Sequence, residues 1–173
     1  LNDGDFDGVL PVSLSGEGQK RFKIRARDWL GHDSANDPIL SAQVDFVAPE
    51  IKDNLNFSRL GEFMGEVVVA TDISVDVFEK NFNEIKAFSS QADVDGTLGE
   101  CDSDDEEEDL WRCHWNSVEV SPSDSVSITF QAKDDFGNTA ERTLSQSFTR
   151  DIVTPQIQFL GTEQIFEDRS YVQ

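Results

Sequence analysis

The sequence predicts an all-β protein built on an antiparallel two-sheet sandwich. Apolar and polar residues alternate along several segments, turn-forming residues separate these segments, and no stretch shows a helical period. Apolar residues make up 37% of the 173 residues and include 13 Phe, which is enough to form a packed core. Seven or so short strands in about 100 residues are typical of such a sandwich.

The individual strands follow from the alternation and from the turn signals. The clearest strands are expected at 73–77 and 126–132, and further strands at 66–70, 84–90, 116–121 and 139–149. Turns are expected at 61–65, 80–83, 93–96, 122–124 and 135–138, where Gly, Pro, Asn and Asp occur. The side chains expected to point inward are Ile73, Val75, Val77, Ile85, Val126, Ile128, Phe130, Ala132 and Phe148.

An internal repeat divides the chain into modules. The segment FKIRARDWLGH, which begins at Phe22, matches ITFQAKDDFGN, which begins at Ile128, and VDFVAPEI matches RDIVTPQI without a gap. The repeat predicts a complete module at 49–154, the C-terminal half of a preceding module at 1–48, and the first strand or strands of a following module at 155–173. The gapless match places Leu40 opposite Gln146, and a one-residue bulge in one copy would repair this register.

The repeated motifs resemble those of a known family. The string A-x-D-x-x-G-N at 132–138, followed by a strand and D-x-x-x-P at Asp151 and Pro155, resembles the Ig-like repeats of large bacterial surface proteins and adhesins. The resemblance implies an Ig-like sandwich with 132–138 between strands F and G, tandem modules joined at D-x-x-x-P, and a location at the bacterial cell surface or outside the cell. The first copy departs from the family pattern, with His32 in place of Asn. Cadherin repeats are a second choice, although their D-x-N-D-N linker is absent.

Charge narrows the classes of partner. The chain has 35 acidic and 14 basic residues, a formal net charge of −21, which disfavours nucleic acid and anionic membrane surfaces and favours cations and basic surfaces. The longest strongly apolar run, 67–70, is too short to cross a membrane. The chain begins without Met or a signal peptide, so we expect it to be an excerpt of a longer protein.

We expect no enzyme activity from this segment. The two histidines, His32 and His114, lie in different modules, and no nucleophile, phosphate-binding or metalloprotease motif occurs. An accessory module of a secreted enzyme remains an alternative.

Cys101 and Cys113 flank a very hydrophilic stretch, and a disulfide between them is favoured. Closing a loop of this size stabilises a fold by roughly 3 kcal/mol. A disulfide indicates an oxidising, extracellular environment. The alternatives are two reduced surface cysteines, or a zinc site that includes His114.

Calcium is the cofactor that the aspartate pattern favours. Asp28 and Asp134 end a strand, Asp45 and Asp151 precede a linker proline, and each pair is expected at one pole of a module, facing the next module. The family resemblance implies that aspartates at this pole bind calcium between modules and stiffen the array. An Asx-turn at Asp134 and capping at Asp151 are the alternative. Two further candidate sets, which are equally explained as hairpin turns, are Asp3, Asp5 and Asp7, and Asp93 and Asp95.

The acidic stretch between the cysteines suggests a second function. We expect it to form an exposed hairpin insertion that binds a cation, a basic protein or a glycan. The candidate residues for this surface are Asp104, Asp105, Glu106, Glu107, Glu108, Trp111 and Trp115. The tryptophans are equally explained by packing beneath the loop, and the carboxylates by solubility. The sequence thus supports two hypotheses: a calcium-stiffened structural or adhesive spacer whose partners are neighbouring modules, or a module that binds a ligand through its acidic loop.

Overall fold

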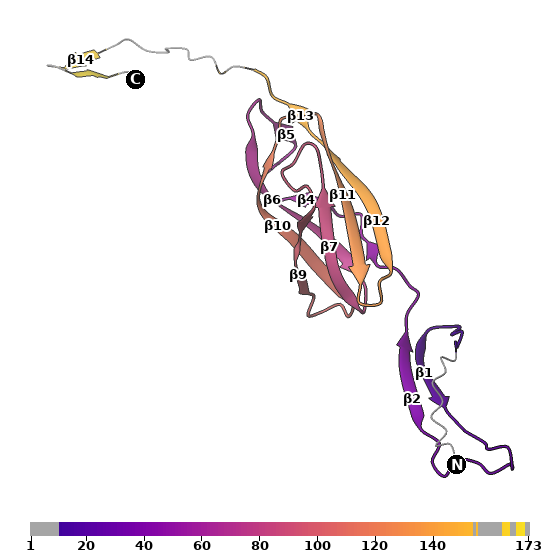
Figure 1. The fold of residues 1–173 in the computed structure, drawn as a ribbon. Helices are drawn as coiled ribbons and strands as arrows, with labels where there is room; N and C mark the ends of the chain where they lie inside the picture. The colour runs from indigo at the N-terminus through magenta and orange to yellow at the C-terminus, as the bar shows by residue number, and fades with distance from the viewer. Residues whose placement is uncertain (1–10, 154, 156–163, 167–168, 172–173) are drawn as a thin grey trace.

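The computed structural model describes residues 11–153, 155, 164–166 and 169–171. Figure 1 shows three parts in chain order: a two-stranded hairpin, an elongated two-layer sandwich and a short C-terminal hairpin. All regular structure in the described residues is β-strand, which confirms the predicted all-β class. In this part of the chain, no helix has the length and apolar character of a membrane span. The C-terminal hairpin comprises β14 (Gln164–Phe166) and β15 (Arg169–Tyr171).

The first sheet of the sandwich is antiparallel, with the strand order β3-β6-β10-β9 and with β4 also paired to β6. Its long central strands pair over most of their length, and β10 contains a register shift between Trp115 and Val118. The strands of this sheet are β3 (Glu50–Ile51), β4 (Asn56–Phe57), β6 (Val69–Phe78), β9 (Glu100–Ser103) and β10 (Leu110–Val120).

The second sheet has the strand order β12-β11-β7-β8, again antiparallel. At one edge of the sandwich, β5 pairs in parallel with β13, next to the end of β12. This order corresponds to the A-B-E-D and G-F-C-C′ sheets of an immunoglobulin-type sandwich, with β11 as strand F and β12 as strand G. The strands are β5 (Phe63–Met64), β7 (Phe82–Phe88), β8 (Thr97–Leu98), β11 (Ser125–Asp134), β12 (Thr139–Ser147) and β13 (Thr149–Arg150).

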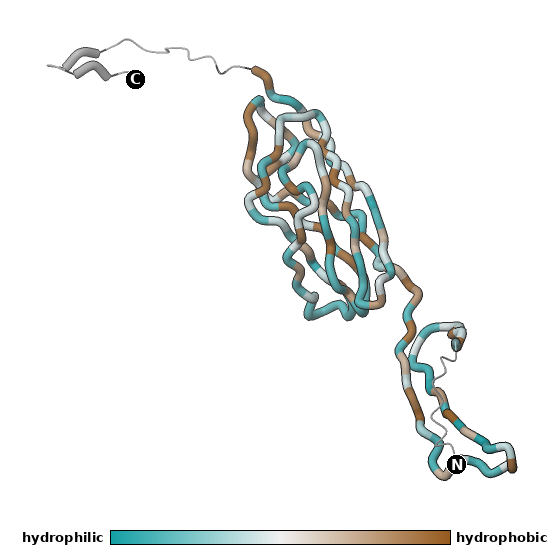
Figure 2. Tube along the Cα trace, viewed as in Figure 1, coloured by the Kyte–Doolittle hydropathy of each residue, from teal (hydrophilic) through white to brown (hydrophobic). Residues whose placement is uncertain are grey.

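The core lies between these two sheets, and the alternation along the strands produces it (Figure 2). Every side chain that was expected to point inward is buried, from Ile73 on β6 to Phe148 after β12. Trp115 on β10 and Phe130 on β11 meet across the core, with ring centroids 5.3 Å apart. The period-two pattern therefore identified part of the core correctly, but Phe57, Met64 and Trp115 also belong to it and were not predicted.

Several strand boundaries differ from the prediction. β5 lies within the turn expected at 61–65, and β7 begins at Phe82, inside the turn expected at 80–83. The segments 66–70 and 73–77 were expected as separate strands, but 66–68 lie outside any strand, and a single strand, β6, begins at Val69 and continues through 73–77. The strand expected at 116–121 begins earlier, at Leu110, because a bulge lets the pairing with β6 continue past a local irregularity. At this bulge Ser117 has a φ of 55°, and its amide donates to the Asp72 carboxylate at 2.9 Å.

The N-terminal hairpin consists of β1 (Gly18–Lys23) and β2 (Ile39–Val44). Its pairing of Phe22 with Leu40 corresponds to the pairing of Ile128 with Leu144 in β11 and β12. Between these paired positions the first hairpin is longer by two residues. The bridge between Arg27 and Asp33 has the same spacing as the pair of Lys133 and Thr139, so the two extra residues lie between Asp33 and β2. The proposed irregularity is therefore two residues long, not one.

Candidate metal centre

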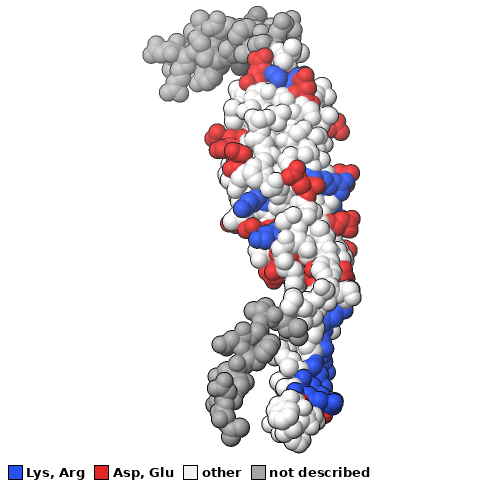
Figure 3. Space-filling model, turned by 45° about the vertical axis from the view of Figure 1, so that its right-hand side comes forward, with Lys and Arg blue, Asp and Glu red and all other residues white. Residues whose placement is uncertain are grey.

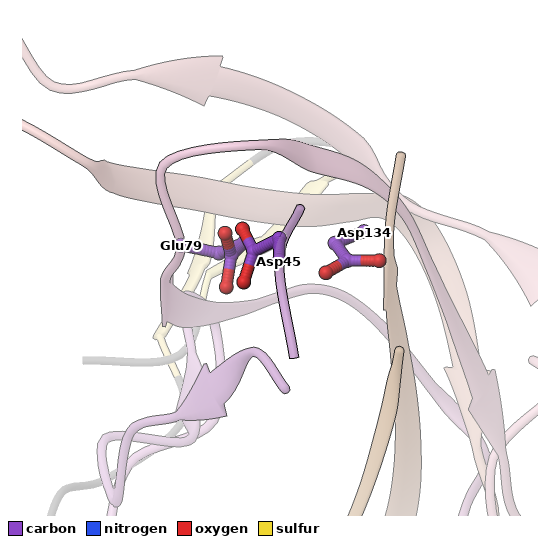
Figure 4. A group of neighbouring side chains, drawn as sticks. All are labelled: Asp45, Glu79 and Asp134. Carbon is purple, nitrogen blue, oxygen red and sulfur yellow. The ribbon is translucent and has the colours of Figure 1, made fainter. Parts of the chain in front are cut away.

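Three carboxylates meet at the pole of the sandwich where the chain enters it from β2. Asp45 follows β2, Glu79 follows β6, and Asp134 ends β11. One carboxylate oxygen from each lies within 4.8 Å of the others, and Figure 4 shows the three side chains converging. Within the described ranges, no other set of three or more His, Cys, Asp or Glu side chains converges in this way.

Two of these carboxylates are buried because they continue the inward-facing rows of the core. Glu79 extends the row of Ile73, Val75 and Val77, and its exposed fraction is 5%. Asp134 extends the row that ends at Ala132, and it is fully buried. Sequence reasoning missed Glu79. The signal was present, since a carboxylate at the next inward position of an alternating strand is unusual.

The Asp134 carboxylate organises the turn between β11 and β12. Its Oδ1 accepts the amides of Phe136 and Asn138 at 2.9 and 2.7 Å, and its Oδ2 accepts Nδ2 of Asn138 at 2.7 Å. Gly137 follows with a φ of 89°, a conformation that favours glycine. The Asx-turn expected at Asp134 is therefore present, and the same side chain also faces the two other carboxylates.

Two asparagines attach the linker to the pole. Nδ2 of Asn81 donates to Oδ2 of Asp45 at 2.7 Å, and Nδ2 of Asn138 donates to the carbonyl of Asp45 at 3.2 Å. Asp45 also forms an Asx-turn, since its Oδ1 accepts the amide of Val47 at 3.0 Å. Glu79 is held locally, because its Oε1 accepts the amide of Asn81 at 2.9 Å.

The electrostatics of the cluster are unfavourable without a cation. Burial raises the pKa of Glu79 above its ordinary value, and the charges of Asp45, Asp134 and Asp109 raise this pKa further, against the opposing effect of the Asn81 amide. In the described part of the chain, no ion pair to Lys or Arg involves any of the three carboxylates. Three negative groups in a partly dry site repel one another, and a divalent cation would remove this repulsion.

The donor set suits a hard cation. Calcium binds carboxylate and carbonyl oxygens at about 2.3–2.6 Å, so two ligands across the ion are separated by about 5 Å or less. The 4.8 Å limit on the three oxygens is compatible with this geometry. Three carboxylates supply three to six of the six to eight oxygens that calcium takes, and the remainder would come from water or carbonyls.

The predicted pairing of aspartates at one pole is wrong. Asp134 precedes β12 and Asp151 follows it, and a strand of this length separates its two ends by about 30 Å. Asp134 instead meets Asp45, which lies in the segment between β2 and β3. The same reasoning separates Asp28 from Asp45, which lie before and after β2.

Asp28 and Asp151 have local roles in the described structure. Asp28 forms a turn like that of Asp134: its Oδ1 accepts the amides of Leu30 and His32 at 2.9 and 2.8 Å, and Nδ1 of His32 lies 2.9 Å from its Oδ2. Hydrogen bonds from the His32 amide and side chain, and from the Leu30 and Gly31 amides, lower the pKa of Asp28. Asp151 repeats the turn of Asp45, since its Oδ1 accepts the amide of Val153 at 3.1 Å.

The remaining metal candidates do not join the cluster. Asp93 and Asp95 lie on the exposed turn before β8, where Gly96 has a φ of 71°, so the hairpin-turn explanation accounts for them. Asp3, Asp5 and Asp7 lie outside the described residues.

The structure contains the predicted disulfide. Cys101 on β9 and Cys113 on β10 are directly paired across the two strands, with Cα atoms 4.0 Å apart. The acidic stretch forms the tip of this hairpin, and the disulfide leaves neither cysteine free to bind zinc.

The hairpin tip contacts the carboxylate cluster through Glu79. The Glu79 amide donates to the Asp109 carbonyl at 2.8 Å, and Nε1 of Trp111 donates to the Glu79 carbonyl at 2.8 Å. Trp111 also stacks on Phe82 with ring centroids 5.2 Å apart. Trp111 is therefore half-buried beneath the tip and positions the backbone of Glu79.

Trp115 was a candidate for partner binding, and the structure corrects this. Its exposed fraction is 5%, it packs on Phe130, and its Nε1 donates to the Thr97 carbonyl at 3.2 Å. The alternation along β10 turns position 115 inward, so the side chain is part of the core.

Within the acidic tip, Asp104 differs from its neighbours. Its Oδ1 accepts the amides of Glu106 and Glu107 at 2.9 and 3.2 Å, and its Oδ2 lies 3.3 Å from the Arg112 guanidinium. These amides, and the charge of Arg112, lower the pKa of Asp104. Asp104 shapes the loop. The exposed carboxylates are those of Asp105, Glu106, Glu107 and Glu108.

Comparison with known proteins adds no family assignment. No protein-family model matches the chain, and no curated protein sequence matches it.

Proposed function

We propose that this chain is a structural segment of a modular extracellular protein of the bacterial surface type, in which calcium binds where a linker enters an Ig-like module. The single observation that carries the proposal is the cluster of Asp45, Glu79 and Asp134. One ligand comes from the linker and two come from the module, so an ion bound there would fix the linker to the pole of the sandwich. Such a device stiffens a spacer.

The surroundings of the cluster support this proposal. Asn81 and Asn138 already hold Asp45 against the pole, which pre-organises the third ligand and lowers the entropic cost of binding. The disulfide-closed hairpin holds Glu79 through Asp109 and Trp111. A disulfide together with the absence of a spanning helix in the described residues is compatible with an extracellular, oxidising environment.

The test is a calcium titration of the full chain, followed by thermal unfolding. A ligand at a hundredfold excess over its Kd stabilises the folded state by about 2.7 kcal/mol, which corresponds to a rise in Tm of roughly 10 °C or more for a domain of this size. We expect this rise in the parent, and we expect Glu79→Gln and Asp134→Asn each to remove it.

The chain offers a matched control. Asp28 forms the same type of turn as Asp134 but stands outside the cluster. We therefore expect Asp28→Asn to keep the full calcium response. The proposal fails if the parent does not respond to calcium, or if all the variants respond as the parent does. The relaxation of the Phe46 and Val47 amides with and without calcium then measures whether the ion stiffens the linker.

The acidic tip offers a second candidate function, because four adjacent carboxylates, at 105–108, are exposed there. These groups would bind a basic protein or a glycan by electrostatic attraction, with an on-rate that falls as salt rises. The variant to use replaces 105–108 with Ser and Gly and keeps Asp104, since Asp104 shapes the loop. Capture of a basic partner that is lost at unchanged Tm would establish this function. Unchanged capture would leave the carboxylates as solubilising groups.

A further inference from the structure

The N-terminal hairpin leaves an apolar face uncovered. Val12, Leu14, Phe22, Ile24 and Leu40 line one open groove on this face. Ile24 and Leu40 are 49% and 55% exposed, although their repeat counterparts on β11 and β12 lie in the core. Burial of these side chains requires a further layer of structure.

The complete module shows what covers the corresponding face. On the side away from β12, β11 pairs with β7, whose Ile85 and Ala87 face the core. Above it, Val118 and Val120, the repeat counterparts of Val12 and Leu14, pair with β6. In the hairpin, 12–14 therefore corresponds to the last part of the opposite sheet, and the positions of β6 and β7 have no counterpart among the described residues.

The other face of β1 and of the residues that follow it is basic. The outward positions of 21–27 are all basic, and Figure 3 shows these cations gathered along the hairpin. Their counterparts on β11 are Ser127, Thr129, Gln131 and Lys133. Lys133 pairs across the sheet with Glu84 of β7, so a strand like β7 would place a carboxylate opposite Arg27. Within the hairpin, Asp33 already pairs with Arg27, and Asp37 pairs with Lys23 and Arg25.

We propose that this hairpin is an interaction surface for the front half of an Ig-like module. A strand like β7, with Ile85 and Ala87 on its inward face and Glu84 on the other, would add antiparallel along β1, and a strand like β6 would add to 12–14 and fill the groove. The mode of recognition is β-strand addition combined with completion of a core. The inference rests on the modular organisation proposed above and is independent of the metal centre.

The chain itself supplies the probe. A copy of residues 49–117 is placed directly before Val12, so that the copied Ser117 precedes Val12 as Ser117 precedes Val118. We expect a second cooperative unfolding transition and amide exchange in 21–27 that is slower by at least about a hundredfold than in the parent chain. Ile24→Asp in this fusion is expected to abolish both effects.

A second fusion tests whether Lys20, at a position that is buried in the complete module, prevents the fused module from folding. Lys20 stands where the complete module has the buried Val126, so the fusion is repeated with Lys20→Val. If neither fusion shows the new transition or the slower exchange, the proposal is overturned.

Sedimentation of the unextended chain tests whether a second copy of the chain, rather than the front half of a module, covers the groove. Dimerisation that Ile24→Asp abolishes would show that a second copy covers the groove, and it would also overturn the proposal. A monomer at all concentrations, together with a folded fusion, supports it. Calcium does not enter either readout, so this proposal and the metal centre can fail separately.

Discussion

The two hairpins of this chain share their local structure and differ in almost every tertiary property. The turn at Asp28 and the turn at Asp134 have the same hydrogen bonds from the residues two and four positions later, and each has a glycine with a φ near 90°. Even the side-chain contact is preserved, since His32 replaces Asn138 as the partner of Oδ2. Yet Asp28 is exposed and Asp134 is fully buried.

The difference lies in the layer above each hairpin. β11 and β12 lie beneath β6 and β10, whereas no second sheet covers β1 and β2 within the described residues. Phe130 is consequently fully buried, and Ile24, its repeat counterpart, is half exposed. The comparison teaches that the hydrogen bonds of a turn are local, while burial, and with it any function that depends on convergence of charges, comes from the opposite sheet.

The largest expected effect is on the stability of the sandwich core. Phe130→Ala should lower the free energy of unfolding of the sandwich by about 3–5 kcal/mol, because it opens a cavity next to Trp115. Ile24→Ala should change it by less than about 0.5 kcal/mol, since no core surrounds that side chain. Urea denaturation of the full chain measures both. Equal losses would mean that the hairpin is already packed in a core.

The next effect concerns the disulfide between β9 and β10, in the sheet that covers β11 and β12. Replacing both cysteines with alanine should cost the sandwich about 2–4 kcal/mol, because the unfolded chain gains freedom and Cys113 lies in the core. Amide exchange in β1 and β2 should not change, since the bond lies in the sandwich and not in the N-terminal hairpin. A comparable increase in exchange in both regions would contradict the independence of the two hairpins.

The two turn aspartates should also respond unequally. In the presence of a chelator, Asp134→Ala should cost about 1–3 kcal/mol, because two backbone donors in a buried turn lose their acceptor. Asp28→Ala should cost less, because water can replace the carboxylate there. The Tm of the sandwich measures the first change, and chemical shifts of the Leu30 and His32 amides measure the second. An identical loss of order in the two turns would show that burial contributes nothing.

The smallest effect is a pH dependence of stability that arises from Asp72 on β6. The Ser117 amide holds the pKa of Asp72 below its ordinary value, with help from the Ser58 hydroxyl and the charges of Arg59 and His114. A depressed pKa in the folded state stabilises the fold above the unfolded-state value of about 3.9, and this contribution is lost as the pH falls through the folded-state value. The parent should therefore be more stable than Asp72→Asn near pH 7, and the difference should shrink below about pH 4. Urea midpoints at several pH values test this, with Asp95→Asn as the control on an exposed turn.

Residue periodicity identified the long strands of the sandwich and the side chains of its core that were assigned from it. Ile128 and Phe130 were assigned to the buried face from alternation alone, because a strand turns successive side chains to opposite faces. The turn at Asp134 also followed from sequence, because an Asx-turn and a left-handed glycine involve only neighbouring residues. The pairing of Cys101 with Cys113 was accessible for a similar reason, since only two cysteines occur.

Only the tertiary structure decided which carboxylates meet. Asp45 was expected beside Asp28, and Asp134 beside Asp151, because the repeat shows that these positions are equivalent but not which strand ends are adjacent. The antiparallel order places the ends of β6 and β11 next to the entering linker, and so it unites Asp45, Glu79 and Asp134. Trp115 illustrates the same limit, since its position beside an acidic loop in sequence says nothing about the sheet that covers it. Hydrogen bonds within a turn act over a few residues and can be read from them, whereas burial and charge clusters depend on contacts between segments far apart in the chain.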